Sequence, residues 1–575
     1  MNTCSTRFTY VKSHALLLLT VFPLILSGCG EGNVREESVG AKASVARQVG
    51  AASVPVRQNI TDFVKNPKLV NDFRNATEIM RKNGTAKPST PEFRTSLVFW
   101  ANTHGFFGTG KNATNYDAIV KYRGPQCLDF FTSEPYSYSK SDAQAVCESY
   151  FTASSQPFTP DQYSEGIWGT CQHTNATTRA TPRFLPWHRL YLYYYERTLR
   201  KHSGNADFAL PYWNYFDYTA TVPKGNLYLP PLVTDGGSIA NNTFFDQLRT
   251  EWLNERKVSM TPDNADATDA FAAPSFVDFS NTLEGVPHGA MHCATGNGCT
   301  TPHIGWVPVA GNDPAFYMHH ANIDRLWQCW MVREANGARI DLAWAKANLG
   351  MPESWYQIKF DFADENGNRV SKTIADAFSP EVLAVHYDEE VDCQIAPRKS
   401  MKNLLLADIE TVHTELQGTE QVLAAGKTEL AARPKTVELS AQPKLREANG
   451  VTANKLLESM GPVSPGVWLV LENITVKQAP AHTYNVYISH KNRPGKRALV
   501  TRFNFFGFGE HAHHGEAGSM GTQRYYLNDD ISELGIRDAR DIVVQFEPSN
   551  AVTGEVLNTD QESLISIDSI RLISR

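Results

Sequence analysis

The chain has 575 residues, of which 42% are hydrophobic and 20% are charged, and its formal net charge is −7. One hydrophobic core rarely serves so long a chain, so two to four domains are expected. A mild negative charge without a basic stripe argues against a nucleic-acid-binding protein.

The N-terminus has the pattern of an export signal. Arg7 and Lys12 precede an apolar stretch over residues 15–26, which is too short to span a bilayer as a stable helix. The sequence LSGC that follows resembles the lipobox of bacterial lipoprotein signals, in which the chain is cut before the cysteine and its thiol receives lipid. We therefore expect residues 1–28 to be a signal peptide and Cys29 to anchor an exported protein to the cell envelope, at the outer membrane or the periplasmic face. The alternative is an ordinary secretory signal that ends in cysteine.

Changes in composition divide the remaining chain into further parts. Residues 29–85 are expected to form a tether and an N-terminal segment, and residues 86–345, rich in histidine and aromatic residues, a helical core. Residues 346–400 form a shorter mixed module. The stretch 401–462 is rich in Ala, Glu, Lys and Leu and is broken by proline, which predicts a helical or loose linker.

Residues 463–575 have a different pattern. Runs of β-branched and aromatic residues alternate with turn residues, which predicts strands. The expected strands are 467–471, 484–488, 499–506, 542–546 and 565–573. The expected fold class is therefore a mainly α core followed by a C-terminal all-β domain of the sandwich or barrel type.

The first of three segments that direct histidines inward begins at Phe184. Pro186 suits the first turn of a helix that should end at Gly204. His188 then lies on the same face as Leu192, which is the face expected to be buried. The spacing predicts a buried imidazole.

The second segment contains His288 and His292. Because they are four residues apart, both imidazoles project from one face of a helix and can bind one metal ion. For any single histidine a structural role is the more common explanation, but several inward-facing histidines on such segments predict a metal site.

The third segment begins a helix with Asp313 as its N-cap and a proline in its first turn. His319 and His320 follow on this helix. Asp324 lies four residues after His320, so its carboxylate is expected to orient that ring. Imidazole ligands suit zinc, copper, iron or nickel, and the lack of clustered carboxylates argues against a carboxylate di-iron site.

Together these segments resemble the tyrosinase and polyphenol oxidase (catechol oxidase) family of di-copper proteins. Residues 184–189 are similar to its first copper signature, and residues 288–292 with 313–325 are similar to its second. The resemblance implies a pair of copper ions inside a four-helix bundle. It assigns His104, His173 and His188 to the first copper, and His288, His292 and His320 to the second, with His319 beside them as an outer neighbour.

The resemblance continues beyond the copper signatures. Residues 360–366 are similar to the middle module of plant polyphenol oxidases. The C-terminal strands resemble the domain that covers the copper site of these enzymes until it is removed.

The nine cysteines fit an oxidising compartment. After Cys4 leaves with the signal and Cys29 receives lipid, an odd number remains. Cys171 precedes His173 by two residues, which resembles the fungal pattern of a thioether bond between cysteine and the ligand imidazole. The other six cysteines could then pair, and the expected disulfides are Cys127–Cys147, Cys293–Cys299 and Cys329–Cys393, although the sequence alone does not determine the connectivity. The alternative is that Cys171 joins a disulfide and another thiol stays free.

The resemblance implies oxidation of small phenols by O2, chiefly of o-diphenols (catechols) to o-quinones, with O2 reduced to water. Glu284 matches a glutamate that holds a catalytic water in the family, whereas Gly289 stands where enzymes with strong monophenol hydroxylation often have Asn. We therefore expect catechol oxidation first and monophenol hydroxylation second. The alternatives are a haemocyanin-like oxygen carrier and an o-aminophenol oxidase.

Overall fold

The computed structural model divides the chain into two units, residues 1–52 and 53–575. It describes residues 55–105, 132, 139–141, 167–216, 227–390, 393, 395, 421–441, 466–507, 522–558 and 565–574, except positions 88–89, 176, 297, 300–302, 477–479 and 481. The first unit, with Cys29, lies outside the described residues, as do Cys127 and Cys147. None of the described helices is both long and apolar enough to cross a membrane.

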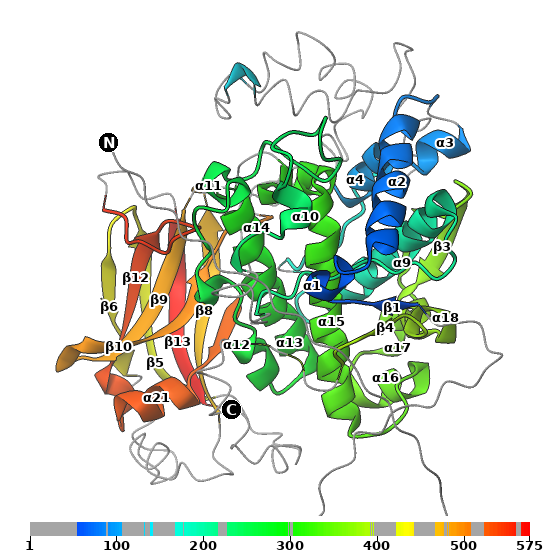
Figure 1. The fold of residues 1–575 in the computed structure, drawn as a ribbon. Coiled ribbons are helices and arrows are strands. Elements are labelled where there is room, and N and C mark those ends of the chain that lie inside the picture. The colour runs from blue at the N-terminus through cyan, green and yellow to red at the C-terminus, as the bar shows by residue number, and fades with distance from the viewer. Residues whose placement is uncertain are drawn as a thin grey trace, which may run out of the picture. The chain divides into compact units, whose positions relative to one another are not determined.

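The described residues 55–395 are mainly helical and are called the helical core below (Figure 1). The elements are β1 (Val56–Arg57), α1 (Ile60–Phe63), α2 (Pro67–Asn83), α3 (Pro91–Arg94), α4 (Leu97–His104), α9 (Phe184–Ser203), α10 (Pro231–Thr234), α11 (Glu251–Asn254), η2 (Pro262–Asn264), α12 (Thr268–Ala272), α13 (Phe276–Leu283), η3 (Glu284–Gly289), α14 (Ala290–Thr295), η4 (His303–Gly305), η5 (Val307–Asn312), α15 (Pro314–Ala335), α16 (Leu342–Asn348), α17 (Glu353–Tyr356), β2 (Lys359–Ala363), β3 (Arg369–Thr373), η6 (Ile374–Phe378), α18 (Pro380–Leu383) and β4 (His386–Tyr387).

Helix α9 begins and ends where the sequence predicts, and helix α15 begins where the sequence predicts. α9 runs from Phe184 to Ser203 and stops at Gly204, whose φ of 67° is in the left-handed region that favours glycine. α15 begins after Asp313, whose side chain accepts a hydrogen bond from the Ala315 N–H at 2.7 Å. The structure therefore confirms both predicted helices.

Aromatic packing joins the long helices of the helical core. The rings of Tyr195 on α9 and Tyr317 on α15 stack with centroids 3.7 Å apart. The Tyr191 hydroxyl donates to the Trp100 carbonyl at 2.6 Å, which ties α9 to α4. α4, α9, the η3–α14 segment and α15 carry most of the predicted ligands, and the regular four-helix bundle stays a prediction.

Described residues 421–574 form two sheets, called the β domain below (Figure 1). The strand order is β11-β8-β13-β5-β7 in one sheet and β10-β9-β12-β6 in the other. Leu469 and Ile570 from the first sheet share a buried core with Val486 and Val544 from the second, as in a sandwich. Its elements are β5 (Gln421–Leu430), β6 (Lys435–Glu438), β7 (Ser440–Ala441), β8 (Val467–Val476), β9 (Thr483–His490), β10 (Arg493–Phe503), β11 (Gln523–Tyr526), α21 (Asn528–Leu534), η10 (Ala539–Asp541), β12 (Ile542–Ser549) and β13 (Ile565–Ser574).

The expectation of a helical or loose linker is wrong for residues 421–441, which form β5, β6 and β7. Their composition favours a helix, but β5 pairs with β13 along its length, from Leu430 opposite Ile565 to Gln421 opposite Ser574. Tertiary pairing therefore overrides the local preference.

Two of the predicted disulfides are present. Cys293 is bonded to Cys299, and Cys329 to Cys393. Cys171 is buried and forms no disulfide in the described part of the chain.

Arg249 and Asp313 form an ion pair that is buried on both sides, with contacts of 2.7 Å from both Nε and Nη2. Because Asp313 also caps α15, we predict that Asp313→Asn lowers the free energy of unfolding by about 3 kcal/mol or more, since it leaves a guanidinium buried without its partner. Urea unfolding of the full-length protein measures this change.

Asp62→Asn is the matched control, because Asp62 pairs with Lys65 at the surface. It should cost less than about 1 kcal/mol. Equal effects of the two substitutions would show that the Arg249–Asp313 pair is not buried in solution.

Candidate metal centre

The predicted ligands come from five places in the helical core. His104 is the last residue of α4, His188 lies in the second turn of α9, and His173 lies in the segment before that helix. His288 and His292 lie on the continuous η3–α14 segment, and His319 and His320 on α15. All are buried except His173, which is half-buried.

Most of these rings are oriented by a hydrogen bond at Nδ1. The acceptor is a backbone carbonyl in four cases: Phe184 for His188 (2.8 Å), Glu284 for His288 (2.9 Å), Ile304 for His292 (2.6 Å) and Val307 for His104 (3.2 Å). A carbonyl oxygen only accepts, so Nδ1 carries the proton. Each Nε2 therefore keeps its lone pair for a metal ion.

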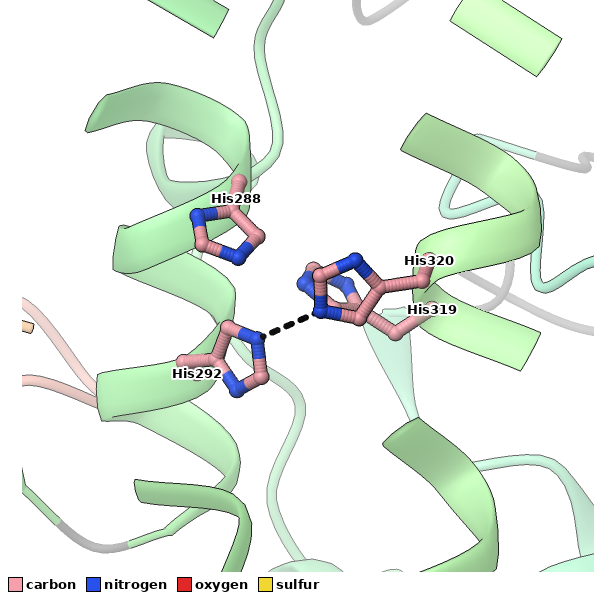
Figure 2. A group of neighbouring side chains, drawn as sticks. All are labelled: His288, His292, His319 and His320. Atoms are coloured by element: carbon pink, nitrogen blue, oxygen red, sulfur yellow. Dashed lines mark hydrogen bonds between the residues drawn. The ribbon is translucent and has the colours of Figure 1, made fainter. Parts of the chain in front are cut away.

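The second-copper candidates form one compact group (Figure 2). One ligand nitrogen from each of four histidines lies within 4.8 Å of the others: His288, His292, His319 and His320. Figure 2 shows His288 and His292 on one helical segment facing the pair on α15, with Nε2 of His292 and Nε2 of His320 3.2 Å apart. The spacing of four therefore does place both imidazoles on one face, as predicted.

The first group contains His104, His188 and the Cys171 thiol, also with one ligand atom each within 4.8 Å. The ring of His188 in this first group stacks on the ring of His320 in the second group, with centroids 4.3 Å apart, so the two groups adjoin. Cys171 Sγ lies 3.5 Å from Nε2 of His188. The thioether bond between Cys171 and His173 stays a prediction.

His173 is held by Glu284. Its Nδ1 lies 3.0 Å from Glu284 Oε1, which also accepts a hydrogen bond from the Thr174 N–H at 2.9 Å. The His173 ring lies 5.8 Å from those of both His104 and His288, so it borders both groups. Glu284 Oε2 is buried and has no hydrogen-bond partner among the described residues. Its predicted water-holding role stays a prediction.

His319 is closer to the second group than the sequence suggested. Its Nδ1 hydrogen-bonds with the Tyr215 hydroxyl, and its ring lies 4.5 Å from that of His292. The Nε2 atom has no hydrogen-bond partner in the described part of the chain. Both His319 and His320 thus present a nitrogen to the group, and the assignment of His320 as the ligand stays a prediction.

The predicted role of Asp324 is wrong. Its Oδ1 accepts from Arg189 at 2.6 Å, and its Oδ2 accepts from Arg57 at 3.0 Å and from the Tyr387 hydroxyl at 2.6 Å. Nδ1 of His320 has no hydrogen-bond partner among the described residues. Two guanidinium groups draw the carboxylate away from the ring, and Asp324 instead ties α15 to α9 and to the N-terminal strand β1.

Five of the buried imidazoles have a pKa below the usual value for histidine. Burial lowers the pKa of His188, His288, His292 and His320 well below the usual value for histidine, and neighbouring imidazoles lower it further. Burial also lowers the pKa of His319 to about 3. Neutral imidazoles with buried, inward-facing nitrogens are a donor set that fits two copper ions, one in each group.

Aromatic side chains enclose this site. Phe184 lies 4.5 Å from the rings of both His188 and His288, and Phe316 lies 4.2 Å from that of His320. Phe506, which follows β10 in the β domain, stacks on His292 with centroids 3.9 Å apart and planes 5° apart. The β domain therefore places an aromatic ring directly against the second histidine group.

Gly289 lies beneath another side chain of the β domain. The Asn504 amide donates to the Gly285 carbonyl at 2.8 Å, and a Cβ added at Gly289 would lie 2.5 Å from Asn504 Oδ1. Glycine at this position makes room for Asn504, which is why a larger residue does not fit in this arrangement.

No pattern in the sequence indicates that Phe506, Asn504 and Tyr215 lie at the site. Phe506 lies more than 200 residues after His292 and Asn504 more than 200 residues after Gly289, and no local pattern links them. The carbonyls of Ile304 and Val307 carry no sequence signal, because any residue supplies a carbonyl.

Comparison with known proteins agrees with this geometry. The family model described as the common central domain of tyrosinase matches residues 142–251 and 233–333. Residues 142–333 of the chain therefore match the central domain of the tyrosinase family. It is 31% identical over 261 residues to tyrosinase HcTyr1 of Hahella sp. (strain CCB-MM4), an alignment that covers 41% of this chain and 51% of that one. The two histidine groups fit the copper pair of the family.

Plant members of the family are also similar. The chain is 24% identical over 408 residues to a chloroplastic polyphenol oxidase of Malus domestica, with 64% of each chain covered. It is 31% identical over 235 residues to catechol oxidase B of Solanum tuberosum, which covers 36% of this chain and 37% of that one. The matched region thus spans between about a third and two thirds of the length of these three relatives.

One solved structure shares the fold over nearly the whole chain. The recombinantly expressed latent aurone synthase (polyphenol oxidase) superimposes with a TM-score of 0.51 at 18% identity, covering 92% of both chains. At this identity the likeness concerns the fold: a helical core followed by a β domain.

We predict that the copper-loaded full-length protein holds about two copper ions per chain, and that His188→Ala and His288→Ala each lose at least one, because each removes a nitrogen from one group. Elemental analysis after dialysis measures the ratio. His386→Ala, which changes an exposed histidine paired with Glu390, should keep both ions. Unchanged copper content in all three variants would contradict the assignment.

Proposed function

We propose that the protein is a di-copper oxidase that converts o-diphenols to o-quinones while O2 is reduced to water. The observation that carries the proposal is the convergence of imidazole nitrogens from two adjoining groups, in which four of the rings are held at Nδ1 by a backbone carbonyl. The match to the central domain of the tyrosinase family supports the same reaction class.

A bound copper pair would supply the exchange of two electrons between a catechol and dioxygen. The side chains around it supply position and a dry environment. Phe184 and Phe316 exclude water beside the imidazoles, and the fixed rings keep the ligand geometry unchanged when charge moves. Substrate would reach the site from the side of Glu284 and Phe506, where a cavity of about 100 Å³ adjoins His173.

Oxidation of catechols is the main proposed activity, and hydroxylation of monophenols the lesser one. A monophenol must lose its proton before it is hydroxylated, and Glu284 Oε2 is the nearest carboxylate oxygen with no partner among the described residues. Oε1 of the same residue is occupied by His173 and Thr174. With Gly289 contributing no side chain, Glu284 is the residue that we propose to support proton removal.

We also propose that the β domain limits access to the site through Phe506. The ring lies flat on His292 and 5.4 Å from His288, so a phenol that approaches this face must displace it. Asn504, two residues earlier, is hydrogen-bonded to the helical core at Gly285 and holds the segment in place.

The experiment is oxygen uptake by copper-loaded full-length protein with 4-methylcatechol and, separately, p-cresol. We predict turnover of 4-methylcatechol that exceeds turnover of p-cresol. Phe506→Ala should raise the catechol rate about tenfold, because loss of an aromatic contact worth about 1.4 kcal/mol shifts the open fraction by that factor. Phe506→Tyr, which keeps the ring, is the matched control and should stay slow.

Other outcomes separate the alternatives. Reversible oxygen binding without turnover of any phenol, in Phe506→Ala as well as in the unaltered protein, would contradict the oxidase and favour a carrier. Oxidation of o-aminophenol but not of 4-methylcatechol would show that o-aminophenols, rather than catechols, are the substrates. Equal rates for Phe506→Ala and the unaltered chain would reject the access role of the β domain.

We further propose that Cys29 carries a lipid that anchors the exported protein to the cell envelope, on the basis of the lipobox at residues 26–29. Expression of the full chain in a bacterium should give a membrane-associated protein, and Cys29→Ser should move it to the soluble fraction. Cys4→Ser, within the expected signal peptide, is the control and should leave the distribution unchanged. A Cys29→Ser protein that stays with the membrane would refute the anchor.

A further inference from the structure

The cavity beside Glu284 lies between the helical core and the β domain. His173, Arg179 and Glu284 line it from the helical core, and Arg502 and Phe506 from the β domain. Because His173 and Glu284 also belong to the histidine site, a molecule whose ring reaches that site would leave its other end in this cavity.

Arg179 is held in place by its backbone. Its N–H donates to the Asn175 carbonyl at 3.0 Å, closing a turn, and its own carbonyl accepts from the Asn281 side chain on α13 at 3.2 Å. The turn is further fixed by Asn175 Oδ1, which accepts from the backbone N–H of Thr177 and Thr178. The guanidinium therefore extends from a rigid base.

Arg179 is half-buried in the wall of the cavity, and its guanidinium forms no ion pair or hydrogen bond with the described residues. Burial lowers its pKa to about 10, the charge of Arg524 lowers it further, and Asp278, Tyr525 and Glu284 oppose the change. A group with this pKa is still protonated at neutral pH. A partly buried guanidinium whose N–H groups have no partner among the described residues is able to bind an incoming anion, and the low dielectric of the cavity wall strengthens that attraction.

The other charged groups of the cavity are occupied or belong to the β domain. Asp266 accepts a hydrogen bond from the Thr268 N–H at 2.9 Å, and burial raises the pKa of its carboxyl group. Arg502 donates to Asn264 Oδ1 at 3.2 Å. Of the two arginines that line the cavity, Arg179 is therefore the one that belongs to the helical core.

We propose that Arg179 is a specificity-determining residue, which binds the carboxylate of catechols that carry a short acidic side chain. The inference rests on the proposed oxidase function and names its substrate class. A carboxylate suits the planar guanidinium, because its two oxygens accept two parallel hydrogen bonds. The ring of such a substrate would lie at the histidines while its acid group lies in the cavity.

The kinetic test compares three substrates: 3-(3,4-dihydroxyphenyl)propanoate, its methyl ester and 4-methylcatechol. It uses full-length copper-loaded Phe506→Ala protein, or the unaltered protein if that is the more active. Arg179→Gln should raise KM for the acid about 10- to 100-fold, the loss expected for a hydrogen-bonded charge pair. kcat for the acid, and KM for the two neutral substrates, should change less than about twofold.

Two further variants separate binding from a structural effect. Arg179→Lys keeps the charge and should recover part of the affinity for the acid. Arg339→Gln removes an exposed arginine of the helical core and should change nothing. If the acid and its ester have equal KM values in the parent protein, or if Arg179→Gln raises KM for all three substrates alike, the inference is wrong.

A second measurement does not depend on turnover. Calorimetric titration of copper-free full-length Phe506→Ala protein with 3-phenylpropanoate should show binding that Arg179→Gln weakens about tenfold or more, whereas 3-phenylpropanamide binds both proteins equally weakly. If no catechol is oxidised by any variant, the proposed oxidase function fails, and this titration still decides the role of Arg179. No difference between the acid and the amide would refute it.

Discussion

The direction of the imidazole Nε2 atoms is the constraint on which the rest of the structure depends. Each of four rings is held at Nδ1 by a carbonyl that accepts but never donates, so the other nitrogen keeps its lone pair. Two of these carbonyls lie one turn earlier on the same helical segment as the ring, at Phe184 and Glu284. The other two, at Ile304 and Val307, lie in η4 and η5. The fold of that intervening region therefore sets the site as directly as the histidines do.

Burial of so many imidazoles lowers the free energy of unfolding, because polar rings lose their contact with water. The packing around the rings offsets this loss. Stacked aromatic rings, such as Tyr195 on Tyr317, join the long helices, and so do buried ion pairs between side chains. Asp324 binds Arg57 and Arg189 at once, so the N-terminal strand, α9 and α15 meet at one carboxylate. A site assembled from segments this far apart in sequence exists only when these ties are complete.

The sequence predicted those parts of the fold and site that local signals determine. Asp313 and Gly204 mark helix ends by capping, the spacing of His288 and His292 places both on one face, and alternating β-branched runs predict the later strands of the β domain. Local signals did not predict the features that depend on contacts with residues distant in the sequence. β5 is a strand because β13 pairs with it, Asp324 turns to two arginines rather than to His320, and Phe506 reaches His292 from another domain. The choice between His319 and His320 needs the metal itself, because both nitrogens reach the group.

The β domain contributes the Phe506 ring, which covers the second histidine group, and one wall of the cavity that Arg179 also lines. Access of a substrate to the histidines and selection among substrates would therefore both be controlled where the helical core meets the β domain. The central claim remains the copper pair, one ion for each of two adjoining histidine groups. Electron paramagnetic resonance of the oxidised, copper-loaded full-length protein tests it most directly, because two cupric ions that share a bridging ligand couple their spins. The account predicts about two copper ions per chain with little or no resonance signal. A signal of full intensity from isolated cupric ions would contradict it.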